Sequence, residues 1–105
     1  MTMAKLTLAV APTFSAAVAI PLPGGDSAEV VITFKHHTRT ELRTLAEKLE
    51  STPDIELVQQ IATGWDLVDA WTPENVHQLL ENHHGAALAI WNTYVRELTG
   101  LREKN

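Results

Sequence analysis

The spacing of the apolar residues changes near residue 36, and this change constrains the fold more than any other feature of the sequence. In residues 14–22 and 29–35, apolar side chains occupy every second position, which is typical of strands with one buried face. From Thr38 onwards they recur at every third or fourth position, which is typical of amphipathic helices. The sequence therefore predicts an α+β fold, in which an N-terminal β-hairpin or small antiparallel meander precedes a bundle of about four α-helices.

A strong turn signal separates the two predicted strands. Residues 21–27 read Pro-Leu-Pro-Gly-Gly-Asp-Ser, and the two glycines can adopt positive φ. Leu6, Leu8 and Val10 also alternate with polar or small residues before Pro12, so that a three-stranded meander is the alternative to a simple hairpin. Because two strands alone are only marginally stable in water, we expect their apolar face to rest on the helices.

Caps and stops mark the predicted helices. Thr38 and Glu41 form a capping-box pair, which begins the first helix. Residues 65–71 are predicted to form a short helix or an irregular link. The other predicted boundaries are a stop and cap at residues 51–54, a helix end at Gly64, a helix start at Thr72 and Pro73, and a separation at Gly85. Apolar residues at helical spacing are Leu42, Leu45, Ala46 and Leu49 in the first helix, and Ile55, Val58, Ile61 and Ala62 lie on one side of the second. The third helix is expected to bury Val76, Leu79 and Leu80.

Length, charge and cysteine content limit the class of protein. At 105 residues the chain is expected to form a single domain, 1–105, with a hairpin region at 1–36 and a helical region at 37–105. Its formal charge of −5 and its scattered Lys and Arg predict neither a nucleic-acid surface nor a polybasic membrane contact. The absence of cysteine excludes disulfides, thiolate catalysis and cysteine-based zinc sites.

Targeting and membrane segments are not predicted. Residues 5–19 loosely imitate a signal peptide, but Pro12, Thr13 and Ser15 interrupt the apolar run. The alternation of apolar residues in this stretch favours a strand over a signal peptide. No apolar run approaches the length that a transmembrane helix needs.

Histidines and paired carboxylates are the candidates for chemistry. Neighbouring histidines diverge on a strand or a helix, and no His-Glu-x-x-His pattern occurs, so we expect no metal and no other cofactor. Carboxylate pairs at helical spacing are typical of exposed helix faces and predict no catalytic residues. A small hydrolase or metal-dependent enzyme is therefore the least favoured function. The residues considered are His36, His37, His77, His83 and His84, with Glu47, Glu50, Asp66 and Asp69.

An aromatic stripe near the end of the chain gives the best functional hypothesis. Residues 86–101 carry one apolar stripe at helical spacing, formed by Ala87, Ile90, Trp91, Tyr94, Leu98 and Leu101. Such a stripe must be covered by its own domain or by a partner. Trp65 and Trp91 are expected to hold the helices together, whereas Trp71, beside a helix cap, is expected to be partly exposed. The candidate partner-binding residues are Trp71, Ile90, Trp91, Tyr94, Leu98 and Leu101.

Scattered short matches along nearly the whole chain also indicate a family. They comprise Pro12-Thr13-Phe14, the Ile-Pro-Leu-Pro-Gly-Gly turn, Val31 to Glu41, Gly64-Trp65, Pro73-Glu74-Asn75, Ala86 to Ile90, Tyr94 and the closing Arg-Glu-Lys-Asn. Together these resemble the tail assembly chaperones of long-tailed bacteriophages and prophages. The chain has His83-His84-Gly85 where a Tyr-Pro pair would be expected.

The resemblance implies a function without catalysis. Such chaperones work in the host bacterial cytoplasm, bind the phage tape measure protein and keep it soluble while tail tube subunits polymerise around it. They are not expected in the mature virion, and a frameshifted longer form recruits the tail tube protein in many phages. Self-association as a homo-oligomer is left open, and neither nucleic acid nor membrane is an expected partner. The alternative is a generic protein–protein interaction or adaptor module.

Overall fold

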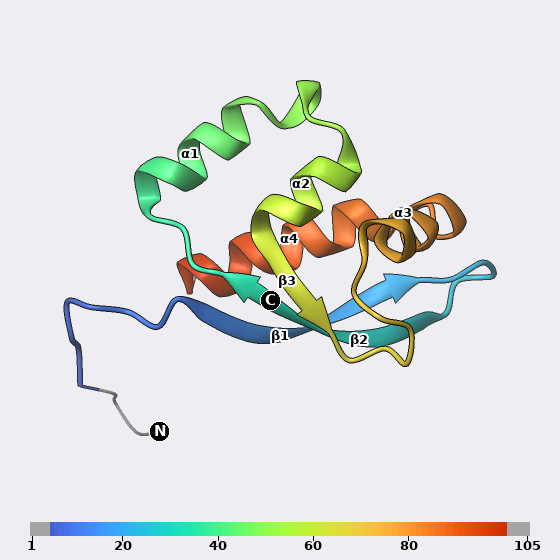
Figure 1. Ribbon diagram of the computed structural model, residues 1–105, viewed down its shortest axis with the longest axis horizontal. Helices are drawn as coiled ribbons and strands as arrows, with labels where there is room; N and C mark the ends of the chain where they lie inside the picture. Colours follow the sequence, from blue (N-terminus) through green and yellow to red (C-terminus); the bar gives the residue numbers. More distant parts are fainter. Residues whose placement is uncertain (1–4, 101–105) are drawn as a thin grey trace.

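A three-stranded antiparallel sheet and four α-helices make up the computed structural model, which describes residues 5–100 (Figure 1). The α+β prediction is confirmed. In chain order the elements are β1 (Thr13–Pro21), β2 (Ser27–Lys35), α1 (Arg39–Glu47), the short 3₁₀ turn η1 (Leu49–Ser51), α2 (Asp54–Ile61), β3 (Ala62–Trp65), α3 (Pro73–Asn82) and α4 (Ala86–Thr99).

The predicted hairpin is formed by β1 and β2. Val18 lies opposite Val30 in the register, and the strands meet at the turn after Pro21. Gly24 and Gly25 have φ values of 89° and 97°, a region in which other residues are strained. The two glycines therefore permit the turn that the sequence predicts.

The third strand comes from an unexpected part of the chain. β3 lies within the predicted helical region, 37–105, and pairs antiparallel with β2. The predicted helix end at Gly64 was therefore wrong, since α2 ends at Ile61 and the backbone is already extended at Ala62. Beyond the strand, the Asp66 backbone N–H donates to the Val31 carbonyl at 3.0 Å. The edge of β2 supplies hydrogen-bond partners that residues 62–66 take up instead of continuing the helix.

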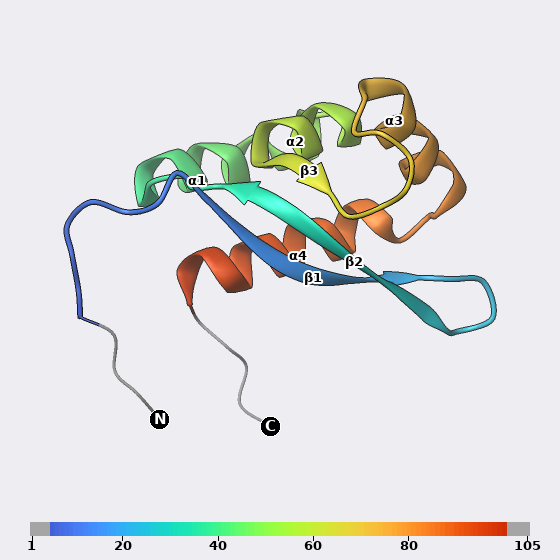
Figure 2. The same ribbon diagram turned by 60° about the horizontal axis from the view of Figure 1, so that its bottom comes forward.

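Residues 6–10 do not form the third strand of a meander. Leu6, Leu8 and Val10 are 89%, 100% and 59% exposed, and no strand is assigned to them. Figure 2 shows the segment before β1 running away from the rest of the molecule. Alternation alone did not make a strand here, because the segment has no neighbouring strand to pair with in this structure.

One face of the sheet meets the helices and the other meets solvent. Side chains at even positions of β1 and β2 are buried or partly buried from Phe14 to Ile20 and from Val30 to Phe34, whereas the odd positions of β1 are exposed. All four helices lie on the buried side (Figure 1). The fully or nearly fully buried apolar core consists of Val18, Ile20, Val30, Ile32, Phe34, Leu57, Val58, Ile61, Ala62, Val76, Ala86, Ile90, Trp91 and Tyr94.

The helix starts follow the predicted caps in two cases of three. Thr38 and Glu41 form the predicted capping box of α1, and the Thr72 hydroxyl accepts a hydrogen bond from the Asn75 backbone N–H at the start of α3. At α2 the helix starts within the predicted residues 51–54, but Pro53 occupies the cap position and no side chain caps the helix. The hydroxyls of Ser51 and Thr52 instead donate to the carbonyl of Lys48.

Candidate functional site

The aromatic stripe lies on α4 and faces the sheet. Ile90, Trp91 and Tyr94 are 1%, 9% and 0% exposed and belong to the core of the chain. Leu98 is partly buried against that core, and Leu101 lies outside the described residues. Whether any of these residues binds a partner stays a prediction. Because Ile90, Trp91 and Tyr94 are buried, a partner that contacted this stripe directly would have to reach side chains at its margin, such as the partly buried Leu98.

Tyr94 joins α4 to the end of the hairpin. Its ring centroid lies 5.2 Å from that of Phe34 and 6.1 Å from that of Phe14. Its hydroxyl donates a hydrogen bond to the Lys35 carbonyl at 3.0 Å. Burial raises the pKa of Tyr94 above its usual range, and the negative charge of Glu41 raises it further. Tyr94 is thus a neutral, hydrogen-bonded core residue.

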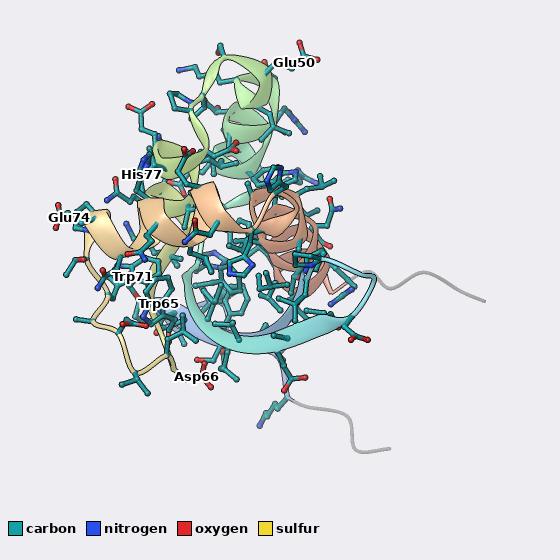
Figure 3. The ribbon with its side chains drawn as sticks, turned by 90° about the vertical axis from the view of Figure 1, so that its right-hand side faces the viewer. Glu50, Trp65, Asp66, Trp71, Glu74 and His77 are labelled. Carbon is teal, nitrogen blue, oxygen red and sulfur yellow. The ribbon has the colours of Figure 1, made fainter. Side chains whose placement is uncertain are left out.

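Trp65 and Trp71 pack against each other where the loop after β3 leads into α3. Their rings meet edge to face, with centroids 4.9 Å apart and planes at 84°, and Figure 3 shows the two side chains together. The Trp65 indole N–H donates to the Asp69 carbonyl at 2.7 Å. Both tryptophans are partly buried, and the loop between them is irregular, which is one of the two predicted forms. Trp71 is therefore partly exposed, as expected, and Trp65 is less buried than expected.

A cleft opens beside this pair of tryptophans. It has a volume of about 200 Å³ and lies between the loop after β3 and α3. Asn75 is one of its lining residues, and its side-chain N–H donates to the Ala70 carbonyl at 2.8 Å. The cleft is lined by Trp65, Leu67, Asp69, Asn75, Gln78, Leu79, Asn82 and His83. We call it the Trp65 cleft.

A second, more apolar hollow lies between α2 and α4. Its volume is about 210 Å³, and its lining residues are Leu49, Asp54, Leu57, His84, Ala87, Leu88 and Trp91. We call it the α2–α4 groove. Leu88 is 64% exposed, and the sequence analysis did not single it out. The spacing of Ala87, Leu88 and Trp91 would have revealed it as part of a second stripe beside the core stripe.

The side chains that line these hollows include Asp54 and Asp69 but no Lys or Arg. Between Leu49 and Val95 the sequence holds no Lys or Arg. The same stretch holds seven acidic residues, all with exposed side chains: Glu50, Asp54, Glu56, Asp66, Asp69, Glu74 and Glu81. Figure 3 shows Glu50, Asp66 and Glu74 at separate outer edges of the molecule. Lys and Arg are therefore not evenly scattered along the chain: they are absent from a long stretch that carries seven acidic residues, and the sequence alone contains this information.

The histidines lie in separate parts of the structure. His37 approaches Glu41 at 3.6 Å, and its Nε2 atom lies 2.8 Å from the Gln60 carbonyl oxygen. His83 and His84 line hollows near the start of α4. Among residues 5–100, no group of three or more His, Asp or Glu side chains is placed to hold a metal ion. Within the same part of the chain, no helix is long and apolar enough to cross a membrane.

Comparison with known proteins identifies a family. A family model described as phage tail assembly chaperone matches residues 1–105. The searches of curated proteins and of solved structures found no match to the chain.

Proposed function

Because this chain belongs to the phage tail assembly chaperone family, we propose that it binds the tape measure protein and keeps it soluble while the tail tube is assembled. The observation that carries the proposal is the match of the family model over residues 1–105. The family also implies a non-enzymatic role, and we propose that the protein acts by binding alone.

The surface of the molecule supports this proposal. A tape measure protein is long and helical, and its apolar faces aggregate while they are uncovered. A chaperone for such a client needs apolar hollows that bind reversibly and a charge that keeps the complex in solution. The α2–α4 groove, whose lining is mainly apolar, offers the first property. The exposed carboxylates around it offer the second.

Five of the six residues named from the sequence lie within the described part of the chain, and they take different parts in the proposed binding. Trp71 and Leu98 are partly exposed, and the largely buried Trp91 lines the α2–α4 groove. We propose that these three side chains contribute contacts to the client. Ile90 and Tyr94 are buried and contribute by holding α4 against the sheet.

The wider setting follows from the family. We propose that the protein works in the host bacterial cytoplasm and leaves before the virion is complete. A longer form made by ribosomal frameshifting would recruit the tail tube protein. Neither nucleic acid nor membrane is a proposed partner.

Co-expression with the tape measure protein of the same phage tests the proposal. We expect the tape measure protein to be insoluble alone and to become soluble and co-purify when this chain is present. The frameshifted form, where the gene encodes one, is tested in parallel. If the tape measure protein stays insoluble with both forms, the chaperone function is wrong and the adaptor alternative replaces it.

A further inference from the structure

The α2–α4 groove has an apolar lining that reaches solvent. Leu49, Leu57, Ala87 and Trp91 line it, and the exposed side chain of Leu88 stands beside them. A single exposed leucine needs no explanation on a protein surface. Here the leucine extends an apolar hollow outwards, so the apolar surface is continuous from the core to solvent.

The dimensions of the groove suit side chains of a helix. Its volume of about 210 Å³ is several times the roughly 30 Å³ that one water molecule occupies in the liquid, and it accommodates one or two apolar side chains. His84, Ala87, Leu88 and Trp91 are spaced as one face of α4, and the partly buried Val95 continues that face. An amphipathic helix lying along this face would insert side chains at three- and four-residue spacing.

The charge around the groove selects the kind of helix. Asp54 lines the groove, and Glu50 and Glu56 are exposed on the turn and the helix beside it. The exposed Lys48 precedes Leu49 in the chain, but the lining of the groove itself contains no Lys or Arg. A partner with acidic flanks would be repelled, whereas one with basic flanks would be attracted and oriented.

We infer that the α2–α4 groove docks an amphipathic helix whose apolar stripe is flanked by Lys or Arg. This inference rests on the proposed function, because it takes that helix to be a segment of the tape measure protein. The apolar stripe supplies the affinity, and the basic flanks supply the selectivity among the client's helices.

Two designed peptides test the chemistry of the occupant. Both carry the same helical leucine stripe, one with Lys and one with Glu at the flanking positions, and both carry a fluorophore for anisotropy. We expect the Lys peptide to bind at least about tenfold more tightly than the Glu peptide at low salt. This preference should shrink as the salt concentration rises from about 50 to about 500 mM. Equal binding of the two peptides, or binding of neither, would overturn the inference.

A matched pair of variants locates the binding site. Leu88→Glu and Val68→Glu each replace an exposed apolar side chain by a carboxylate, and Val68 lies outside the groove. If charge alone attracted the Lys peptide, both variants would bind it as tightly as the wild type or more tightly. We expect Leu88→Glu to weaken binding at least about tenfold, because it removes an apolar contact, while Val68→Glu leaves binding unchanged. Equal effects of the two variants would place the site elsewhere and overturn the inference.

A second pair of variants isolates the carboxylate in the groove. Asp54→Asn removes a charge that lines the groove, and Asp26→Asn removes one from the exposed hairpin turn. We expect the Lys peptide to bind Asp54→Asn more weakly than Asp26→Asn, with a shallower dependence on salt. An identical salt dependence would contradict the role assigned to Asp54.

Co-expression of the variants with the tape measure protein separates this inference from the proposed function. If the wild type and Val68→Glu solubilise the client but Leu88→Glu does not, both are supported. If Leu88→Glu solubilises it fully, the groove inference fails and the chaperone function stands. If neither the wild type nor its frameshifted form solubilises the client while the peptide results hold, the function fails and the assignment of a basic helix to the groove stands.

Self-association is the remaining outcome. α1 carries Arg39 and Arg43 beside Leu42 and Leu45, so α1 of a second copy is a possible competitor for the groove. Sedimentation velocity of the wild type and of Leu88→Glu detects it. An oligomer that Leu88→Glu dissociates, together with no binding of the Lys peptide, would overturn the inference in favour of a second copy.

Discussion

Helices α1 and α4 have similar amphipathic patterns in the sequence but are held in place by different interactions. α4 buries Ala86, Ile90, Trp91, Thr93 and Tyr94, yet its first residue follows a Gly85 that forms no side-chain cap. α1 contains no buried residue, yet it begins with a complete capping box. Local hydrogen bonds therefore define α1, whereas packing against the sheet defines α4. An apolar stripe in the sequence therefore shows that a helix has an apolar face. It does not show whether the same domain or a partner covers that face.

The largest effect should come from placing a charge in the α4 stripe. Tyr94→Glu puts a carboxylate at a position with 0% exposure and removes the hydrogen bond to the Lys35 carbonyl. A buried, unpaired charge is unfavourable by several kcal/mol, against a typical total stability of about 5–15 kcal/mol. We expect this variant to be unfolded at 25 °C by circular dichroism. The matched variant in α1, Leu45→Glu, should stay folded; a folded Tyr94→Glu variant would show that the stripe is not core.

Truncating an apolar side chain should destabilise the protein more in α4 than in α1, with smaller effects than those of a buried charge. Ile90→Ala leaves a cavity in the core and should lower the free energy of unfolding by about 2–5 kcal/mol. Leu42→Ala removes a side chain that is only partly buried and should lower it by less than about 1.5 kcal/mol. Urea titrations followed by circular dichroism measure both values. Equal losses would mean that α1 is packed as firmly as α4.

The predictable parts of the fold are those that depend on interactions between residues close together in the sequence. Alternation around a Pro-Gly-Gly turn gave the hairpin, and Thr38 with Glu41 gave the start of α1, because those interactions join residues close together in the chain. β3 was not predictable in this way. Residues 62–65 follow directly on a helix, and they become a strand only because β2, about thirty residues earlier, offers an unpaired edge.

The candidate site was predictable only in part for the same reason. The spacing of Ile90, Trp91 and Tyr94 correctly predicted a helical stripe, but only the position of the sheet determines that these residues are buried. The exposed Leu88 and the α2–α4 groove depend on how α2 crosses α4, which no short motif encodes. The absence of Lys and Arg between Leu49 and Val95, by contrast, was present in the sequence and was overlooked.

A smaller effect is expected from removing the cap of α1. In Thr38→Ala the hydroxyl that accepts from the Glu41 backbone N–H at 3.1 Å is lost, which should lower the free energy of unfolding by about 1 kcal/mol. Thr40→Ala is the control, because Thr40 is exposed on the same helix and is not its cap. Hydrogen exchange should show faster opening of α1 in Thr38→Ala and unchanged protection of α4. Loss of protection in both helices would contradict the separation between them.

The smallest effect should be a pH dependence confined to the start of α1. The hydrogen bond from the Thr38 backbone N–H, at 2.8 Å, is the main cause that holds the pKa of Glu41 below its ordinary value; the Thr38 hydroxyl and His37 add to it, and partial desolvation opposes it. A carboxyl whose pKa is lower in the folded state stabilises that state above its unfolded pKa of about 4.3. This contribution is lost as the pH falls through the folded pKa.

In an NMR titration from about pH 7 to about pH 3, the Thr38 amide resonance should therefore shift as Glu41 is protonated, while the resonances of Ile90 and Tyr94 stay constant. Glu41→Gln keeps an acceptor without a titrating charge and should abolish the shift. A shift that persists in that variant would show that Glu41 is not its cause. If the resonances of α4 respond over the same pH range, then α1 is coupled to the core more tightly than its absence of buried residues implies.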